Sequence, residues 1–355
     1  MLHSNSITIP DVIHFRKHRR SSDIWLFVLF LTILLLLHSN GFANETRHKK
    51  QQTIKGTVVD EHNQPVVGAR VFIESRDWFE IDKPNLETTT DAKGRFTLTD
   101  EPLHIEGQTL QAKASQNRMA QLSLPYPSQK HLKQPDLNQL RLQLKPPRRV
   151  ELEVFDDAGK PVPAALAGIM DLGKTWGIGR TDSAGKIEFR VPHDTDLKYA
   201  IALRDGYGAD YRAYGLKLEE SIQPDAKPPK FPDHPVQLTL DGAQPVKIKL
   251  ESAEGKPLSG IDIEPLTPLF KPDQPLPMPL MLMFYTTRQL VQTTDGTGTI
   301  VFAWIPHWQK QRMYFGVHNK EYIPHRFVYE PAKDKGAFKV QLKPKKDSSE
   351  KATFP

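Results

Sequence analysis

The sequence has 355 residues, with 30 prolines, 21 glycines and no cysteine, and a formal charge of +6 at pH 7. The absence of thiols excludes a disulfide framework, a thiolate metal site and any enzyme with a cysteine nucleophile. The positive charge is a mild excess, and nothing in the sequence indicates a nucleic-acid-binding face with interleaved aromatic residues. The length allows two or three domains, each large enough to bury its own core.

Residues 1–43 have the pattern of a signal peptide. A basic stretch at 16–20 precedes an apolar run at 24–37, and small residues at 41–43 flank Phe42 as they do in a cleavage site. The apolar run is shorter than the roughly 20 residues that span a bilayer. We therefore expect a secreted, periplasmic or cell-envelope protein. It is anchored in the membrane only if this segment is retained.

One short pattern, Thr-Asp-x-x-Gly, occurs three times in the chain, beginning at Thr90, Thr181 and Thr294. Aspartate can accept hydrogen bonds from the backbone two residues on, and glycine supplies the positive φ at which the chain reverses. Alternating apolar residues after the glycine begin a strand. The pattern therefore predicts one hairpin in three copies.

Each hairpin lies within a longer repeat. An alternating strand and a turn come first, and an evenly spaced proline, Pro65, Pro161 or Pro257, then opens a second strand. A further alternating segment closes each unit, and in the first unit it predicts a half-buried antiparallel strand over 140–144. Because a whole unit recurs, we predict an all-β chain of three tandem sandwiches.

The predicted repeats cover residues 52–145, 146–241 and 242–344 and precede a disordered tail at 345–355. The third repeat contains a proline- and methionine-rich insertion at 265–284. The linkers at 145–149 and 241–245 are short and contain proline, so we expect them to limit reorientation of the units.

The first repeat carries the patterns Gly-x-Val-x-Asp, Pro-Val-x-Gly-Ala-x-Val and Thr-Asp-x-x-Gly-x-Phe, formed by Gly56, Val58, Asp60, Pro65, Val66, Gly68, Ala69, Val71, Thr90, Asp91, Gly94 and Phe96. They resemble the carboxypeptidase regulatory-like domain, a transthyretin-like or prealbumin-like sandwich. The second repeat keeps much of the pattern, including a late Gly206-Tyr207, whereas the third has Ser252 at the position of the first aspartate.

The resemblance implies three tandem antiparallel seven-stranded sandwiches of Ig-like or transthyretin-like type. It also implies a non-catalytic extracytoplasmic module used for adhesion, spacing or ligand binding. The pattern of this family is structural, so it carries no catalytic residues to this chain.

His318 and Glu321 have the His-x-x-Glu spacing of zinc carboxypeptidases. A catalytic zinc also needs a third protein ligand, a base and a pocket, so this pair alone is a weak signal. A metal-dependent hydrolase or metal-binding protein that uses the region 265–325 remains the alternative hypothesis.

The sandwich also resembles intradiol ring-cleaving dioxygenases, which hold iron with two tyrosines and two histidines. Asp210, Tyr211, Arg212 and Tyr214 are similar to the tyrosine side of such a site, but the His-x-His partner is missing. We interpret this segment as loop aromatics.

Two further groups could bind metal ions. Met278, Met281 and Met283 could bind Cu(I) through their thioethers, but methionine is also a common gap-filler in cores, and we expect that role. One carboxylate per repeat is too few for the six to eight oxygens that calcium takes, so we expect turn-forming roles for Asp91, Asp182 and Asp295.

Three tryptophans, Trp78, Trp176 and Trp308, lie in or beside predicted loops. Exposed aromatic rings can stack on sugars or peptides, but such a tryptophan more often covers the end of a core. We therefore assign no catalytic, cofactor-binding or metal-binding residue and no cofactor. The sequence predicts a non-catalytic spacer, adhesion or binding module whose partner is an envelope protein or a polysaccharide. An accessory subunit of a membrane peptidase or surface-export system is a further hypothesis.

Overall fold

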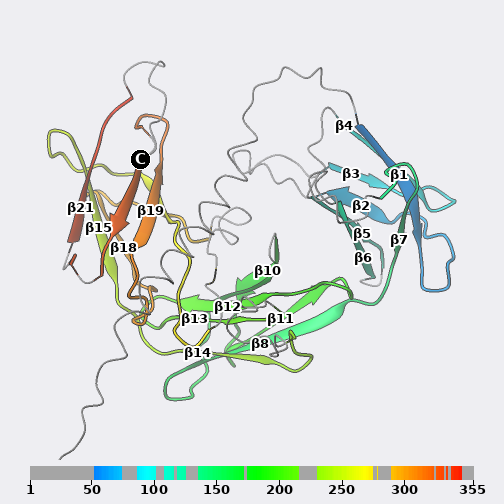
Figure 1. The fold of residues 1–355 in the computed structure, drawn as a ribbon, viewed down its shortest axis with the longest axis horizontal. Coiled ribbons are helices and arrows are strands. Elements are labelled where there is room, and N and C mark those ends of the chain that lie inside the picture. The colour runs from blue at the N-terminus through cyan, green and yellow to red at the C-terminus, as the bar shows by residue number, and fades with distance from the viewer. Residues whose placement is uncertain are drawn as a thin grey trace, which may run out of the picture. The chain divides into compact units, whose positions relative to one another are not determined.

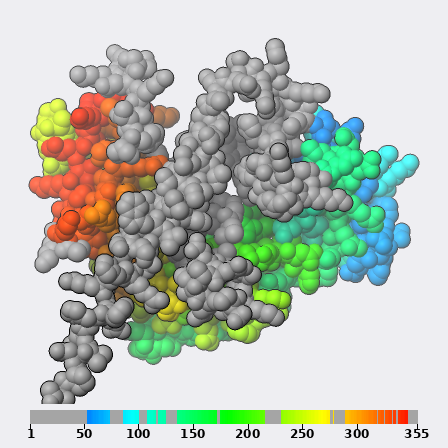
Figure 2. Space-filling view, in the orientation of Figure 1, coloured from blue at the N-terminus to red at the C-terminus, as the bar shows by residue number. Residues whose placement is uncertain are grey.

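The computed structural model describes residues 52–73, 86–100, 108–115, 118–124, 135–171, 174–215, 230–274, 278, 289–323, 325–331, 333–334 and 337–345. The elements in these ranges are the strands β1 to β21, which Figures 1 and 2 colour in chain order from blue to red. No helix within the described ranges is long and apolar enough to cross a membrane. The predicted signal peptide, most of the predicted tail, Trp78, Met281 and Met283 lie outside these ranges.

The first sandwich consists of a three-stranded and a four-stranded sheet. The three-stranded sheet has the order β4–β1–β7, formed by β1 (Gln52–Val59), β4 (Arg95–Asp100) and β7 (Leu140–Gln143). The four-stranded sheet has the order β3–β2–β5–β6, formed by β2 (Arg70–Ile73), β3 (Leu86–Thr89), β5 (Gln108–Lys113) and β6 (Met119–Leu124).

The second sandwich repeats this topology. Its three-stranded sheet, β11–β8–β14, is formed by β8 (Arg148–Asp156), β11 (Lys186–Val191) and β14 (Val236–Leu240). Its four-stranded sheet, β10–β9–β12–β13, is formed by β9 (Leu166–Met170), β10 (Thr175–Arg180), β12 (Tyr199–Arg204) and β13 (Gly208–Ala213).

The third sandwich has the same two sheets. The order β18–β15–β21 is formed by β15 (Val246–Ser252), β18 (Thr299–Phe302) and β21 (Ala337–Leu342). The order β17–β16–β19–β20 is formed by β16 (Asp262–Pro265), β17 (Gln292–Thr293), β19 (Met313–His318) and β20 (His325–Tyr329). The prediction of three tandem seven-stranded sandwiches is therefore confirmed.

The first and last strands of each sandwich pair in parallel, whereas the other strand pairs are antiparallel. The expectation of an antiparallel strand over 140–144 is therefore wrong, because β7 runs parallel to β1, with Leu140 opposite Gly56. Parallel neighbours need a long crossover, and the remaining strands of the sandwich supply it. An alternating pattern reports one buried face but not the direction of the neighbouring strand.

The three Thr-Asp-x-x-Gly turns are built in the same way. The Asp91 carboxylate accepts hydrogen bonds from the backbone N–H groups of Lys93, at 2.8 Å, and Arg95, at 2.9 Å. Asp182 and Asp295 accept the equivalent pairs of bonds at 2.8 to 2.9 Å. The predicted turn role of these aspartates is thus confirmed.

The threonine before each aspartate ties the hairpin to the second strand. The buried Thr90 Oγ1 donates to the Val66 carbonyl oxygen at 2.6 Å and accepts from the Ala69 N–H at 2.8 Å. Thr181 and Thr294 make the same two kinds of bond in the other sandwiches. The Thr-Asp pair is therefore a folding device in all three repeats.

The glycine of each turn has a positive φ, +70° at Gly94 and +72° at Gly185 and Gly298. A Cβ atom would lie 2.5 to 2.7 Å from a backbone carbonyl oxygen of β1, β8 or β15, respectively. Since real Cβ atoms do not approach so closely, both the conformation and the space require glycine here.

Three hydrophobic clusters form the cores. One contains only residues of the first sandwich, and another lies between the two sheets of the second. The third cluster joins the core of the third sandwich to the outer face of β9, β12 and β13 in the second. The strands β9, β12 and β13 of the second sandwich are therefore buried on both faces.

Candidate functional site

Residues that the sequence singled out for metal chemistry are not assembled into a metal site in the described part of the chain. That part contains no group of three or more His, Asp and Glu side chains that could hold a metal ion. His318 ends β19, but its side chain lies outside the description. Glu321 is exposed, and its backbone N–H donates to Asn319 Oδ1 at 2.7 Å, as in a loop turn.

Met278 is fully buried, and its backbone N–H and C=O pair with those of Leu269 at 2.9 Å. It belongs to the hydrophobic cluster of the third sandwich, so the predicted core role is confirmed for this methionine.

Trp176 and Trp308 both serve packing. Trp176 lies in β10, where its Nε1 donates to Asp171 Oδ2 at 2.7 Å and the Lys174 ammonium lies 4.3 Å from its ring centroid. Trp308 is buried in the shared cluster with its ring centroid 6.1 Å from that of Tyr211. Both rings pack against hydrophobic clusters, as expected of tryptophans that cover a core.

The interpretation of Asp210 and Tyr211 as loop residues is wrong. Both lie inside β13 and are fully buried, and Tyr214 follows the strand and packs on Phe231 at 4.8 Å between ring centroids. Nearly every residue of β13 is buried, because alternate side chains from Ala209 to Ala213 join the cluster of the third sandwich while Asp210, on the other face, bonds Thr239 of β14. Such a strand has no alternating pattern, so periodicity could not identify it.

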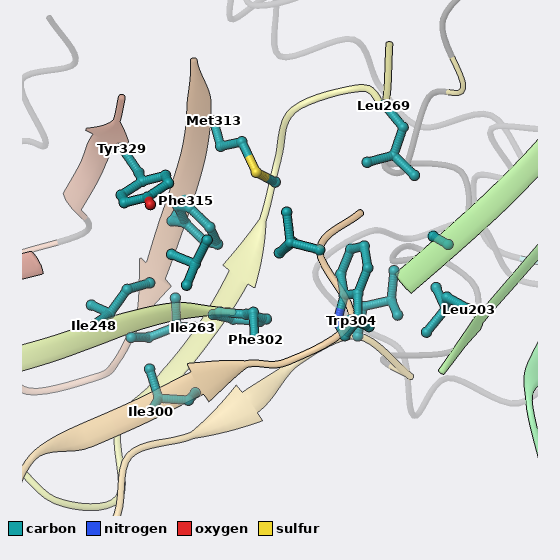
Figure 3. Close-up of a cluster of buried hydrophobic side chains, with 14 of the residues drawn as sticks. Leu203, Ile248, Ile263, Leu269, Ile300, Phe302, Trp304, Met313, Phe315 and Tyr329 are labelled. Atoms are coloured by element: carbon teal, nitrogen blue, oxygen red, sulfur yellow. The ribbon is translucent and has the colours of Figure 1, made fainter. Parts of the chain in front are cut away.

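This contact between the second and third sandwiches is the candidate functional site. Leu203 and Tyr211 from the second sandwich join Leu269, Trp304 and Trp308 from the third in one buried cluster. In Figure 3, Trp304 lies between Phe302 of its own sandwich and Leu203 of the other.

The contact also contains a buried charge network around Asp210. The Asp210 carboxylate accepts from the Lys271 ammonium at 2.7 Å and from Arg212 Nη1 at 3.2 Å. It also accepts from two backbone N–H groups, those of Tyr211 and Thr239, each at 2.8 Å. Asp210 therefore connects its own strand, the edge of the facing sheet at β14 and the third sandwich.

Side chains and backbone of the third sandwich cover the edge of β13. Gln274 Oε1 accepts from the Ala213 N–H at 3.0 Å, and the Lys271 N–H donates to Tyr211 Oη at 3.1 Å. An uncovered edge strand can pair with other chains. The Gln274 contact gives the Ala213 N–H of this edge a hydrogen-bond partner.

The turn before β13 approaches the linker to the third sandwich closely. The Gly206 N–H donates to the Ala303 carbonyl at 3.0 Å, and the Gly242 N–H donates to the Tyr207 carbonyl at 2.9 Å. Gly208 has a φ of +96°, and a Cβ atom there would lie 2.2 Å from the Gly242 carbonyl oxygen. Glycine at this position allows the two backbones to meet.

Two tyrosines at the contact resist ionisation. Burial raises the pKa of Tyr199 to about 12, and burial is also the main cause that raises the pKa of Tyr211. Neither hydroxyl is suited to act as a base at neutral pH.

The contact between the second and third sandwiches holds the two together through groups that are already bonded to each other. The Asp210 carboxylate has four donors and lies out of contact with solvent, so its oxygens already have their partners. A general base must lie within hydrogen-bonding distance of a bound substrate. The Asp210 carboxylate is instead enclosed by the four protein groups that donate to it.

The described contacts between the first and second sandwiches are polar, and the hydrophobic clusters of these two sandwiches are separate. Lys145 pairs through its backbone with Met119 at the edge of β6, and its ammonium lies 2.8 Å from Asp194 of the second sandwich. Gln121 Nε2 donates to Thr195 Oγ1 at 3.2 Å. A hollow of about 190 Å³ is lined by Met119, Gln121, Lys145 and Asp194 together with His193 and neighbours.

Comparisons with known proteins agree with the fold of the first sandwich. Residues 53–123 match the model of the carboxypeptidase regulatory-like domain. No curated protein matches the chain.

Three solved structures are among those that this chain matches. The TIE protein of Bacillus anthracis is 13% identical over 83% of this chain, with a TM-score of 0.20, and the match spans about half (51%) of that structure. The shaft pilin SpaA of Lactobacillus rhamnosus GG is 11% identical over 57% of this chain and 100% of its own, with a TM-score of 0.25. BcpA, the major pilin subunit of Bacillus cereus, is 8% identical over 83% and 99%, with a TM-score of 0.19.

Proposed function

We propose that the protein is a non-catalytic β-sandwich array that acts outside the cytoplasm as a spacer or adhesion module, since its residues 53–123 match the model of the carboxypeptidase regulatory-like domain. The signal-peptide pattern at residues 1–43 supports the extracytoplasmic location. The most regular pattern of the chain, Thr-Asp-x-x-Gly, forms turns, which supports a structural role for the repeats.

The shared hydrophobic cluster of the second and third sandwiches carries this proposal. Separating the two would expose Leu203, Trp304 and their neighbours to water, at a cost of roughly 25 cal/mol per Å² of apolar surface. Domain contacts that are small and polar permit relative motion, whereas an extensive apolar contact opposes it. A spacer or adhesion module needs such coupling, because force or position must pass from one sandwich to the next.

A partner in the cell envelope, either a protein or a polysaccharide, completes the proposal. The alternative hypothesis is a metal-dependent hydrolase that uses the region 265–325. The metal measurement described below separates this hypothesis from the non-catalytic array.

Hydrogen exchange with mass spectrometry, in increasing denaturant, tests the coupling on the chain from residue 44 onward. We expect peptides from β12 and β19 to become exchangeable at the same denaturant concentration, because the two sandwiches share one core. Peptides from β5 serve as the internal comparison, since the first sandwich has a core of its own. Separate midpoints for β12 and β19 would contradict a coupled spacer.

Elemental mass spectrometry of the same protein tests the non-catalytic part of the proposal. We expect no stoichiometric transition metal in the purified chain. A stoichiometric metal that is lost in the variant His318→Ala would overturn this part and favour the hydrolase.

A further inference from the structure

The second sandwich contains a groove of about 450 Å³ beside β13 and β14. Five polar or aromatic side chains line it: Glu153, Arg212, Tyr214, His234 and Gln237. They come from β8, β13 and its end, β14 and the segment before β14, which are far apart in the sequence. The volume lies within the range of small-molecule binding pockets.

The walls of this groove are held in place by contacts outside it. Arg148 donates from Nη2 to the carbonyl oxygens of Phe231, at 3.1 Å, and Pro232, at 2.8 Å, and so fixes the segment that leads into β14. The Phe231 ring in turn packs against Tyr214. A site whose walls are already fixed loses little conformational entropy when a ligand binds.

The two charged groups of the groove are also held by partners. Glu153 accepts from Lys186 Nζ at 2.5 Å and from Gln237 Nε2 at 3.1 Å. Arg212 is held by the buried Asp210 and keeps 30% of its side chain exposed. One cation and one anion face the groove, so its lining carries no net charge from these two residues.

The remaining lining combines hydrogen-bonding groups with apolar surface. In the described part of the chain the Tyr214 hydroxyl makes no hydrogen bond, and His234 and Gln237 are exposed. Pro232, Pro235 and the Tyr214 ring supply apolar surface. A sugar ring has this combination of features, because hydroxyl groups that donate and accept surround its edge while its C–H groups form an apolar face.

We propose that this groove binds a neutral sugar unit of an oligosaccharide, with Arg212, Tyr214 and Gln237 bonding its hydroxyl groups and the proline and tyrosine surfaces covering its ring. The inference deepens the proposed adhesion function by naming the ligand class, and it rests on that function. An acidic sugar fits less well, because Arg212, the cation of the groove, is already paired with the buried Asp210.

The test measures binding of cellobiose, maltose and N,N′-diacetylchitobiose to the chain from residue 44 onward, by saturation-transfer-difference NMR and calorimetry. We expect binding of at least one of these neutral disaccharides. Tyr214→Phe removes one hydroxyl and keeps the ring, so it should weaken the binding roughly tenfold, the value of one lost hydrogen bond. Gln237→Ala, at an exposed position, should weaken it as well.

Tyr314→Phe is the control, because Tyr314 is an exposed tyrosine in the third sandwich, with 43% of its surface exposed, and does not line the groove. It should leave the affinity unchanged. The proposal is overturned if none of the three disaccharides binds, if both groove variants bind as tightly as the parent chain, or if digalacturonic acid binds more tightly than the neutral sugars. These outcomes leave the coupling and metal measurements untouched, so failure of the ligand proposal is distinguishable from failure of the array proposal.

Discussion

Asp210 shows how a single buried charge can hold separate parts of a chain together. Taking a carboxylate and an ammonium out of water costs several kcal/mol for each ion, and only good geometry with further hydrogen bonds offsets this cost. Asp210 has both, since Lys271 and Arg212 bond it along with two backbone N–H groups. Lys271 is itself largely buried, with 14% of its side chain exposed.

The variant Asp210→Ala should destabilise the protein by roughly 3–5 kcal/mol, because it leaves Lys271 buried without its counter-charge. Denaturant unfolding measures the change. The matched control is Asp233→Ala, since Asp233 pairs with Arg148 but has 96% of its side chain exposed, and its loss should cost about 1 kcal/mol or less. Equal losses for the two variants would contradict the role of Asp210. A double-mutant cycle with Lys271→Ala then isolates the pair itself.

At the scale of elements, β13 is the edge strand through which the second sandwich contacts the third. An edge strand presents unpaired backbone groups, and here the third sandwich bonds the Ala213 N–H through Gln274 and holds the Tyr211 hydroxyl through the Lys271 N–H. The turn from β12 into β13 makes this contact possible, because Gly206 and Gly208 let its backbone meet the linker and the end of β18.

Replacing Gly208 by alanine should destabilise the protein more than replacing Gly206. Both glycines have a positive φ, which costs an alanine roughly 1–2 kcal/mol. A Cβ atom at Gly206 meets nothing within 4 Å, whereas at Gly208 it would collide with the Gly242 carbonyl oxygen. Thermal unfolding of the two variants measures the difference. A melting temperature for Gly208→Ala equal to or above that of Gly206→Ala would show that the close approach has no energetic weight.

The first turn of the third sandwich tolerates replacement of its aspartate. Ser252 occupies the position of the first aspartate in the third sandwich, and its Oγ accepts from the Glu254 and Lys256 N–H groups at 3.2 and 3.4 Å. Asp156, its counterpart in the second sandwich, makes the equivalent bonds at 3.0 and 2.8 Å. A hydroxyl therefore replaces the carboxylate with longer hydrogen bonds, and the turn keeps its form.

At the scale of the whole molecule, the cores divide the chain differently from its repeats. The first sandwich has a separate core, but the outer face of the second sandwich belongs to the cluster of the third. Conditions that act on residues in this cluster should therefore affect both sandwiches together.

Alkaline pH provides such a condition. Burial raises the pKa of Tyr199 to about 12 and also raises that of Tyr211, compared with an ordinary value of 10.0. A folded-state pKa above the unfolded value gives stability that is fully present below pH 10 and is lost as pH rises through the folded pKa. The free energy of unfolding should therefore fall as pH rises from 10 toward 12, and Tyr199→Phe should flatten this dependence. Tyr314→Phe is the exposed control, and an identical slope in the two variants would contradict the prediction.

Local patterns were enough to predict the repeat and its turns. Asp91 bonds backbone groups two and four residues away, so a short stretch of sequence contains the whole interaction. The resemblance to a known family then predicted seven strands for each sandwich, which the sheets confirm.

Other features depend on contacts between distant residues, and the sequence carried no signal for them. The strand at 140–144 runs parallel to its neighbour because the sandwich closes its first strand against its last. Asp210 and Tyr211 read as loop residues in the sequence because a strand buried on both faces lacks alternation. The groove was not identified at all, since Glu153, Tyr214 and Gln237 approach one another only after folding.

The sequence by itself thus determined the all-β class, the threefold repetition and the turn chemistry, because hydrogen bonds within a few residues and a period of two along a strand define them. Only the tertiary structure decided that the second and third sandwiches share a core around Asp210 and that a groove forms beside β13. The physical reason is that burial depends on which surfaces meet, and that is a property of the folded chain.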